Sequence, residues 1–295
     1  MFPITNTSLL VDRANIRSTQ IHNHQIDAIE DGQILIEVDQ FALTANNITY
    51  AAIGEQLMYW NFFPTDVAGH GIVPVWGYAK IVTSKVAEIR EGTIIYGYLP
   101  MSKYFVAEPG RIAPHGFRDI VAHRQKNAAI YNNYDFIKPE HYTHPSSPFI
   151  PIIRPLFTTS FLLYHFFTDE NYMGANRIML SSASSKTAVA LASLLSKNKD
   201  EHGKTIMGIT SDKNKAFVEA SGLYEEVYTY DEIAQLPKDS TVIADFAGNK
   251  KLLRAINNEL GDHLKFISAI GLTDWEGNSD LDSVPKATFF FAPTY

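Results

Sequence analysis

The chain has 295 residues, of which 45% are hydrophobic and 19% charged, so it is a globular chain long enough for two domains with separate cores. Its formal net charge is -7 and its lysines and arginines are scattered, which argues against nucleic acid as a partner. It contains no cysteine, which excludes disulfides, thiolate zinc sites and cysteine nucleophiles.

The first residues, Met1 to Asn6, lack the basic and apolar regions of a secretory leader. We also expect no apolar run long enough to span a bilayer. These features predict a cytoplasmic protein without membrane contacts.

The N-terminal third is predicted to be rich in β-strands. Alternating apolar and polar residues over 33–40 follow the turn signal Asp31-Gly32 and predict a strand. Further strands are expected at 78–83, 93–98 and 104–108. Short strands at this spacing are typical of a small barrel-like domain.

Two neighbouring segments, 44–52 and 58–64, combine amides with many aromatic side chains. They can line a pocket for a flat, partly apolar ligand, or form a small core whose polar groups are hydrogen-bonded. The stretch 114–151 has several prolines and predicts a long irregular connection at a cleft and a domain boundary.

Two histidine pairs invite a metal interpretation, His22 with His24 and His141 with His144. Neither pair has an obvious third ligand, so we interpret both as solvated surface and expect no metal site.

The segment 178–195 predicts a strand, a tight turn of small residues and an Ala/Leu-rich helix in direct succession. Such a turn directs free N–H groups and the positive end of a helix dipole outward, which suits a phosphate or pyrophosphate. Serine and alanine stand where glycine is usual, so an ordinary strand with a serine N-cap is the alternative interpretation.

Around this segment strands and helices alternate, which predicts a parallel sheet with right-handed crossovers. Helices are expected at 155–169, 213–220 and 250–260, and strands at 205–210, 226–230, 241–244 and 264–270. Ligands of such sheets bind at the carboxyl ends of the strands. The predicted fold class is α/β, with a Rossmann-type parallel sheet domain and a β-rich domain.

Several stretches occur in an order known from one superfamily: 31–33, Asn46 or Asn47, 74–82 and 91–97, then 244–248 and 266–271. On these stretches the chain resembles the medium-chain dehydrogenase/reductase superfamily, on its zinc-independent, quinone-oxidoreductase-like side. The stretches 46–51, 154–157 and 181–188 are similar to an uncharacterised bacterial branch of it.

The resemblance implies a GroES-like catalytic domain over 1–150, to which 280–295 return, and a Rossmann dinucleotide-binding domain over 151–279. It implies an NADP(H)-dependent oxidoreductase that transfers hydride to a small molecule, an activated C=C or quinone-type substrate, without zinc. Similar proteins run on through a further helical segment beyond the equivalent of Tyr295, and they often form homodimers through the last strand of the cofactor domain.

The choice of cofactor depends on the end of the strand 205–210. Relatives that use NADPH hold its 2′-phosphate at positions similar to Lys215 and Tyr230, whereas Asp212 could bind the ribose of NAD instead. We favour NADP(H). The expected cofactor-binding residues are Ser182, Ala183, Ser184, Ser185, Lys186, Thr187, Thr210, Ser211, Asn214, Lys215, Tyr230, Phe246, Ala247, Gly248 and Ala269.

Without zinc, hydrogen bonds must polarise the substrate carbonyl. Tyr50, or else Tyr59, is the expected proton donor, and Asn46 or Asn47 is expected to orient the nicotinamide or the substrate oxygen. The alternative to a reductase is a catalytically degenerate dinucleotide-binding sensor or structural homologue.

A third interpretation, a P-loop nucleotidase, starts from Ser185-Lys186-Thr187 and Asp245. It fails because the two glycines that the motif requires would fall at Leu180 and Ser185.

Overall fold

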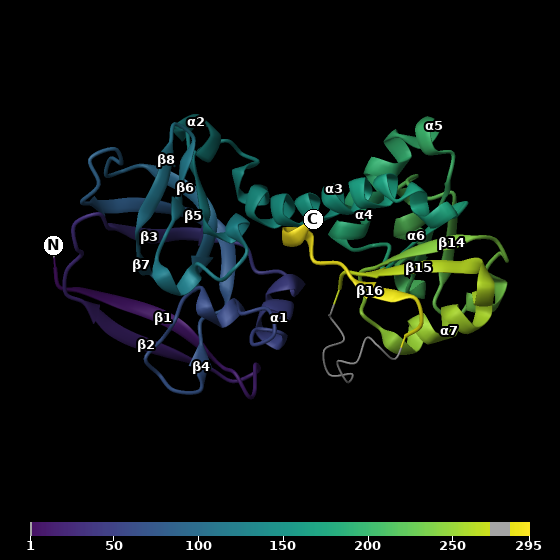
Figure 1. Ribbon diagram of the computed structural model, residues 1–295, viewed down its shortest axis with the longest axis horizontal. Helices are drawn as coiled ribbons and strands as arrows, with labels where there is room; N and C mark the ends of the chain where they lie inside the picture. Colours follow the sequence, from purple (N-terminus) through teal and green to yellow (C-terminus); the bar gives the residue numbers. More distant parts are fainter. Residues whose placement is uncertain (1, 272–283) are drawn as a thin grey trace. The chain divides into compact units, whose positions relative to one another are not determined.

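The chain forms two compact units, Met1–Ile152 and Ile153–Tyr295 (Figure 1). The structure is a computed structural model that describes residues 2–271 and 284–295. Each unit has its own sheets and its own core, and each is described by itself below.

The first unit consists of antiparallel sheets. A three-stranded sheet has the order β2-β1-β4, with β1 (Ile4–Asp12), β2 (Thr19–Ile26) and β4 (His70–Gly71). A seven-stranded sheet has the order β7-β3-β5-β6-β10-β9-β8, with β3 (Ile34–Phe41), β5 (Pro74–Ser84), β6 (Ile94–Pro100), β7 (Tyr104–Ala107), β8 (Pro109–Ala113), β9 (Gly116–Asp119) and β10 (Asn133–Ile137). Its helical segments are α1 (Ala45–Ala52), α2 (Pro139–Tyr142) and the 3-10 turns η1 (Tyr59–Asn61), η2 (Ala122–Arg124), η3 (Ala129–Asn132) and η4 (Ser147–Phe149).

The expected irregular connection over 114–151 is wrong at 116–119 and 133–137, because β9 and β10 lie inside the larger sheet. Tyr134 of β10 stacks on Phe117 of β9 with ring centroids 5.1 Å apart, and its hydroxyl donates to the Tyr98 carbonyl of β6 at 2.7 Å. Tyr134 and Phe117 are therefore core residues.

A buried arginine fixes the segment between β9 and β10. Arg124 is 1% exposed, and its guanidinium donates to Asp119 at 2.8 Å, to the Asn132 side chain at 3.1 Å and to the Tyr134 hydroxyl at 2.9 Å. A further bond reaches the Tyr131 carbonyl at 2.8 Å. A buried charge is tolerated when it is paired and hydrogen-bonded in this way.

The second unit contains a six-stranded sheet in the order β13-β12-β11-β14-β15-β16, and all its strands are parallel. The strands are β11 (Arg177–Ser181), β12 (Thr205–Thr210), β13 (Glu226–Thr229), β14 (Thr241–Asp245), β15 (Leu264–Ala269) and β16 (Ala287–Phe289). The helices are α3 (Ile150–Asp169), α4 (Lys186–Lys197), α5 (Lys199–His202), α6 (Asp212–Ala220) and α7 (Lys250–Leu260), with 3-10 turns η5 (Asn171–Gly174), η6 (Ile233–Gln235), η7 (Gly261–His263) and η9 (Ala292–Thr294). This is the strand order of a doubly wound dinucleotide-binding sheet, so the predicted α/β class is confirmed.

Successive side chains of each strand point to opposite faces of the sheet, so the core of the second unit has one part on each face. Ile178 and Leu180 of β11 face α3 and α4, whereas Met179 faces α7. Figure 1 shows α3 and α4 over one face and α7 over the other. A strand buried on both faces produces the continuous apolar run that the sequence shows.

The expected return of 280–295 to the first domain is wrong for its described part, 284–295. β16 pairs in parallel with β15, Thr288 opposite Ser268, and the Phe290 amide donates to the Ala269 carbonyl at 2.8 Å. Backbone pairing therefore holds this segment in the sheet of the second unit; 280–283 lie outside the described residues.

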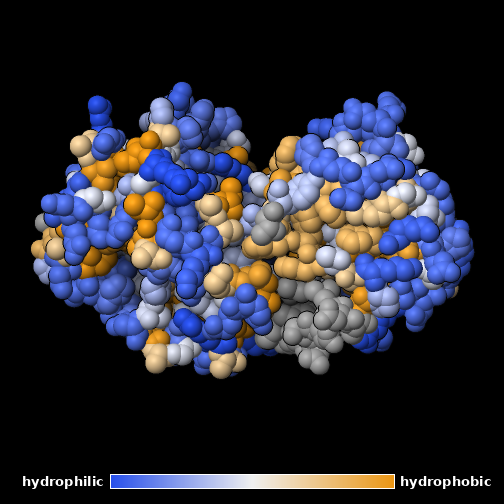
Figure 2. All heavy atoms as spheres, in the orientation of Figure 1, coloured by the Kyte–Doolittle hydropathy of each residue, from blue (hydrophilic) through white to orange (hydrophobic). Residues whose placement is uncertain are grey.

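Helix α3 begins at Ile150, five residues before the expected start, and continues through Pro155. By length and composition alone, the helical stretch Ser147–Asp169 could cross a membrane, so the expectation that no run is long enough is wrong. Only 17% of its most apolar window is buried, and in Figure 2 apolar surface covers the part of the second unit where α3 and the C-terminus lie. One such helix is weak evidence for insertion.

Candidate functional site

The predicted nucleotide turn follows β11 and leads directly into α4. The Ala183 amide donates to a carbonyl of β12 at 3.1 Å, and the Ser185 amide donates to the Ser182 carbonyl at 2.7 Å. Ser185 is the N-cap of α4, where its hydroxyl accepts from the Ala188 amide at 3.3 Å. The first turn of α4 thus lies at the carboxyl edge of the sheet, where helix N–H groups can bind an anion.

The turn follows the backbone path of a glycine turn without containing glycine. Ser182 has a φ of 50°, in the left-handed region that glycine enters without steric cost. For a residue with a Cβ this conformation costs about 1–2 kcal/mol. Strain of this kind persists where the surrounding structure or the function requires the conformation.

Ser181 and Asp245 join the first and fourth strands of the second unit. Both are fully buried, and the serine hydroxyl donates to the carboxylate. The carboxylate also accepts from the amides of Ala247 and Gly248 at 3.3 and 2.9 Å, and the serine oxygen accepts from the Phe246 amide at 2.9 Å. Burial raises the pKa of Asp245, and these hydrogen bonds oppose that rise. The pair fixes the loop after β14 against the nucleotide turn.

The loops after β14 and β15 approach each other closely. The Asp245 carbonyl accepts from the amides of Ile270 and Gly271 at 2.9 and 3.0 Å. A Cβ added at Gly271 would lie 2.0 Å from the Phe246 carbonyl oxygen, so this position requires glycine. Ala269 is 1% exposed, which leaves its side chain little surface for a ligand.

Two hydroxyls at the end of β12 are buried without hydrogen bonds. Thr210 Oγ1 and Ser211 Oγ have no partner in the part of the chain that the structure describes. A buried polar group without a partner costs free energy, so these oxygens fit a site that a polar ligand completes.

Side chains from two further elements reach the nucleotide turn. The Asn214 amide of α6 donates to Ser184 Oγ at 3.0 Å. Burial raises the pKa of Tyr230, and a hydrogen bond between its hydroxyl and Ser182 opposes that rise. The turn, α6 and the end of β13 therefore meet at one place.

Lys215, a predicted ligand of the 2′-phosphate, lies beside the same edge in an ion pair. Its ammonium nitrogen is 2.8 and 3.0 Å from the carboxylate oxygens of Glu232. Glu232 is not among the predicted site residues, because no spacing rule links a residue after one strand to a helix after another strand.

Not every predicted cofactor-binding residue offers its side chain to a ligand. Ala183 is fully buried and its carbonyl accepts from the Tyr224 hydroxyl at 2.8 Å, so its side chain packs inside the core. Lys186 and Thr187 lie in the first turn of α4, and the Thr187 carbonyl accepts from the Ser160 hydroxyl at 2.8 Å.

Two predicted catalytic residues, Asn46 and Tyr50, lie together in the first unit on α1. The Asn46 amide donates to the Tyr50 hydroxyl at 2.7 Å. Burial raises the pKa of Tyr50 to about 12, and the hydrogen bond from Asn46 opposes that rise. Tyr50 is 5% exposed, and it remains protonated at neutral pH.

Asn47, the alternative to Asn46 for orienting the nicotinamide or the substrate oxygen, makes different contacts. Its side-chain oxygen accepts from the Thr44 amide at 2.8 Å, and its side-chain nitrogen donates to the Pro74 carbonyl at 2.9 Å. Together with the Thr44 hydroxyl this forms a capping box at the start of α1. Both polar atoms of Asn47 serve the fold.

Tyr59, the alternative donor, belongs to the same aromatic cluster. Its ring centroid lies 4.6 Å from that of Tyr50, and its hydroxyl is 3.2 Å from the Tyr131 hydroxyl. Tyr59 is 4% exposed, and burial raises its pKa well above the ordinary value. The second tyrosine is therefore also a neutral, buried hydroxyl.

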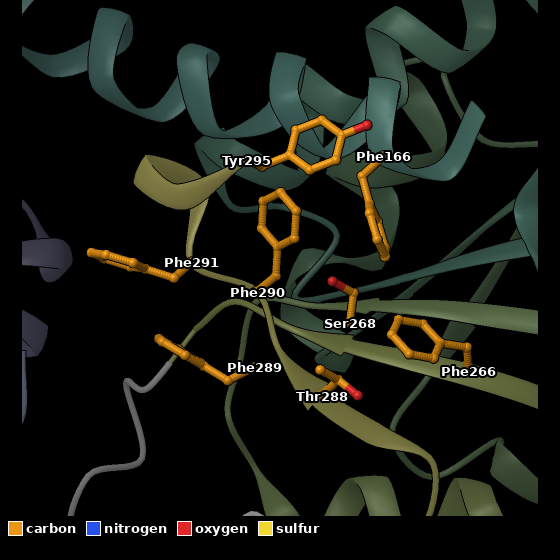
Figure 3. A pocket seen from close by; sticks show the side chains of 8 residues that line it. All are labelled: Phe166, Phe266, Ser268, Thr288, Phe289, Phe290, Phe291 and Tyr295. Carbon is orange, nitrogen blue, oxygen red and sulfur yellow. The ribbon is translucent and has the colours of Figure 1, made fainter. Parts of the chain in front are cut away.

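An aromatic pocket of about 170 Å³ lies at the β15–β16 edge of the second unit (Figure 3). Phe166, Phe266 and Phe290, which line it, also pack against the core on the α3 face. Figure 3 shows the Ser268 hydroxyl pointing toward the Phe290 and Phe166 rings, and that hydroxyl has no hydrogen-bond partner among the described residues. The pocket is the open edge of the core, and it contains no predicted site residue.

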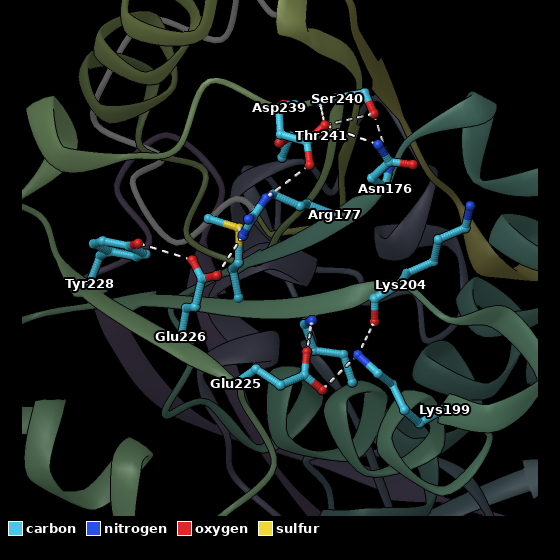
Figure 4. A network of polar contacts seen from close by, with 12 residues as sticks. Asn176, Arg177, Lys199, Lys204, Glu225, Glu226, Tyr228, Asp239, Ser240 and Thr241 are labelled. Carbon is cyan, nitrogen blue, oxygen red and sulfur yellow. Dashed lines mark hydrogen bonds and ion pairs between the residues drawn. The ribbon is translucent and has the colours of Figure 1, made fainter.

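The amino edge of the same sheet carries a different polar network (Figure 4). Arg177 of β11 bonds Glu226 of β13 at 2.6 Å and Asp239, before β14, at 3.3 Å. Nearby, Lys199 pairs with Glu225 at 2.9 Å. These pairs connect strand ends and lie opposite the candidate ligand edge.

The histidine pair of β2 has no metal-site surroundings. His22 stacks on His24 at 5.8 Å and lies 3.3 Å from Asp66. Across residues 2–271 and 284–295, no group of three or more histidines and acidic residues could hold a metal ion.

A family model described as "Protein of unknown function (DUF2855)" matches residues 41–295. The chain belongs to this family. No curated protein matches the DUF2855 chain.

Solved structures with the same fold include a quinone oxidoreductase, an enoyl thioester reductase and TarJ. The quinone oxidoreductase from Coxiella burnetii is 13% identical, with TM-score 0.53, over 98% of this chain and 83% of that one. A mutant enoyl thioester reductase from Candida tropicalis is 10% identical, with TM-score 0.58, over 99% of this chain and 83% of the reductase chain. TarJ of S. aureus is 14% identical, with TM-score 0.52, over 97% of this chain and 80% of the TarJ chain.

At this identity the likenesses establish the fold. The DUF2855 chain has the fold of these proteins, a β-rich GroES-like unit and a Rossmann-type parallel sheet unit, as the sequence predicted. The family description agrees with the expected uncharacterised branch.

Proposed function

We propose that the protein is an NADP(H)-dependent oxidoreductase that binds its cofactor at the carboxyl edge of the second unit's sheet. The observation that carries this proposal is the pair of buried hydroxyls, Thr210 and Ser211, left without partners among the described residues beside the strained turn at Ser182. Structural neighbours support it: TarJ was solved with NADPH, and the other two are reductases by name.

The residues at this edge fit the parts of the cofactor. The turn and the first turn of α4 suit the pyrophosphate, through backbone N–H groups and serine hydroxyls. Ser211, Lys215 and Tyr230 suit the 2′-phosphate. The loop 246–248 and the backbone at Ala269 complete the edge on the nicotinamide side. When bound, NADPH supplies the hydride, and the protein orients it.

Tyr50 is the proposed proton donor, with Asn46 as its positioning residue. A tyrosine whose pKa is about 12 is fully protonated at neutral pH and can donate to the oxygen of an enone or a quinone. This chemistry needs no zinc, and the chain has no cysteine ligand to offer one. The proposed substrate is a small molecule with an activated C=C or a quinone ring; a homodimer is the proposed assembly.

The proposal is tested by titrating the protein with NADPH and with NADH, using nicotinamide fluorescence and calorimetry. Lys215→Ala is expected to weaken NADPH binding at least tenfold and NADH binding much less, because only NADPH carries the 2′-phosphate. Lys199→Ala is the matched control, since Lys199 also pairs with a glutamate but at the opposite edge. No binding of either nucleotide at millimolar concentration would refute the proposal.

A dinucleotide-binding sensor without turnover is the second candidate. It is favoured by Tyr50, which is 5% exposed and hydrogen-bonded by Asn46, so its hydroxyl is enclosed. A panel of enones and quinones with NADPH separates the two functions. Turnover that falls at least tenfold in Tyr50→Phe supports the reductase, and binding with no turnover of any substrate supports the sensor.

A further inference from the structure

Glu232 holds the ammonium group that the proposed 2′-phosphate site depends on. Both of its carboxylate oxygens contact Lys215, at 2.8 and 3.0 Å, and one also accepts from the Thr229 amide at 2.7 Å. The bond to the backbone fixes the carboxylate at the end of β13, so Lys215 is bound to a fixed acceptor.

Both members of this pair are charged at neutral pH. The hydrogen bond to Glu232 raises the pKa of Lys215, and the bonds from Lys215 and the Thr229 amide lower the pKa of Glu232. The two side chains are 29% and 28% exposed, so a ligand can reach them.

The pair lies beside the strand end that carries the unpaired hydroxyls. Thr210 of β12 is the register partner of Thr229, and its carbonyl accepts from the Tyr230 amide at 3.0 Å. In a doubly wound sheet this strand end faces the adenosine ribose of a dinucleotide. A role of Glu232 at this strand end therefore rests on the proposed function.

We propose that Glu232 sets the preference between NADPH and NADH by neutralising Lys215. With the pair intact, a 2′-phosphate meets a carboxylate as well as an ammonium group, and part of the attraction is cancelled. The ribose 2′-hydroxyl of NADH can donate a hydrogen bond to the same carboxylate. Glu232 thus reduces the advantage that Lys215 gives to NADPH.

The test compares dissociation constants for NADPH and NADH in the wild type and in Glu232→Gln. Glutamine keeps the size of the side chain and an oxygen for the Thr229 amide, but it removes the charge. We expect the affinity ratio of NADPH to NADH to rise about tenfold, and the rise to shrink at high ionic strength because it is electrostatic.

Glu225→Gln is the matched control. Glu225 also pairs with a lysine and accepts from a backbone amide, that of Ile206, but at the amino edge of the sheet. The affinity ratio of NADPH to NADH in Glu225→Gln is expected to stay within twofold of the wild-type ratio. In the double variant Lys215→Gln/Glu232→Gln the rise in the NADPH-to-NADH affinity ratio should disappear, because the ammonium group that produces it is gone.

An unchanged ratio in Glu232→Gln, or a shift toward NADH, with both nucleotides still bound, would overturn the inference and leave the proposed function standing. If no variant and no wild-type protein binds either nucleotide, the proposed function fails and the inference fails with it.

Discussion

Ser182 shows how a single residue keeps the geometry of a glycine turn. Its φ of 50° is the conformation for which such turns use glycine, and its neighbour Ser181 is hydrogen-bonded to Asp245. The surrounding bonds therefore impose the conformation on a residue that resists it.

Ser182→Val is expected to lower the free energy of unfolding by about 1–2 kcal/mol and to weaken nucleotide binding, because a β-branched side chain is the least suited to the left-handed region. Ser182→Gly is the control and should bind NADPH at least as well as the wild type. Denaturant unfolding and NADPH titration measure both effects. Equal stability of the valine variant would show that the turn adapts to its side chain.

At the scale of elements, the second unit except β16 could be predicted from its sequence, and the first unit only in part. Ile178 and Met179 belong to one apolar run followed by small residues, and such a run is typical of a strand buried on both faces. β10 was missed because Tyr134 acquires its apolar surroundings only by stacking on Phe117, which no local pattern reveals.

The candidate site also contains residues that the sequence predicts and residues that it does not. The turn at Ser182 and the hydroxyl of Ser211 follow from their positions after strands, so the sequence predicts them. The capping role of Asn47 was not predicted, although Thr44 three residues earlier could have suggested a capping box. The contact of Glu232 with Lys215 depends on the spatial pairing of β12 with β13, which no local sequence pattern indicates.

The network at the amino edge connects β11, β13 and the residues before β14 through Arg177. Arg177→Met is expected to lower the free energy of unfolding by about 1 kcal/mol at pH 7, because its two acidic partners lose a charge-assisted bond. Nucleotide affinity should be unchanged, since the network lies opposite the ligand edge.

The pH dependence of this effect follows from Asp239. Hydrogen bonds from Asn176, Ser240 and Arg177 lower its pKa in the folded state, so its contribution is present above the pKa of the unfolded chain. The contribution is lost as pH falls through the folded value. The stability difference between wild type and Arg177→Met should therefore narrow below about pH 4; a difference that grows on acidification would contradict this assignment.

At the scale of the whole molecule, two cores in two units allow a ligand to stabilise one unit selectively. NADPH at one hundred times its dissociation constant is expected to stabilise the unit that binds it by about 2.7 kcal/mol. Amide hydrogen exchange should slow over β11 to β14 and stay unchanged in β5 and β6. Equal protection of both units would show that the cofactor acts on the molecule as one cooperative body.

The position of β3 has a practical consequence for anyone who shortens this protein. The family match begins at residue 41, the last residue of β3, yet β3 lies between β7 and β5 in the larger sheet. A shortened protein that starts at Phe41 would lose that strand and expose two unpaired backbone edges, which promotes aggregation. The point at which sequences of the family become recognisable is therefore no safe place to cut the polypeptide.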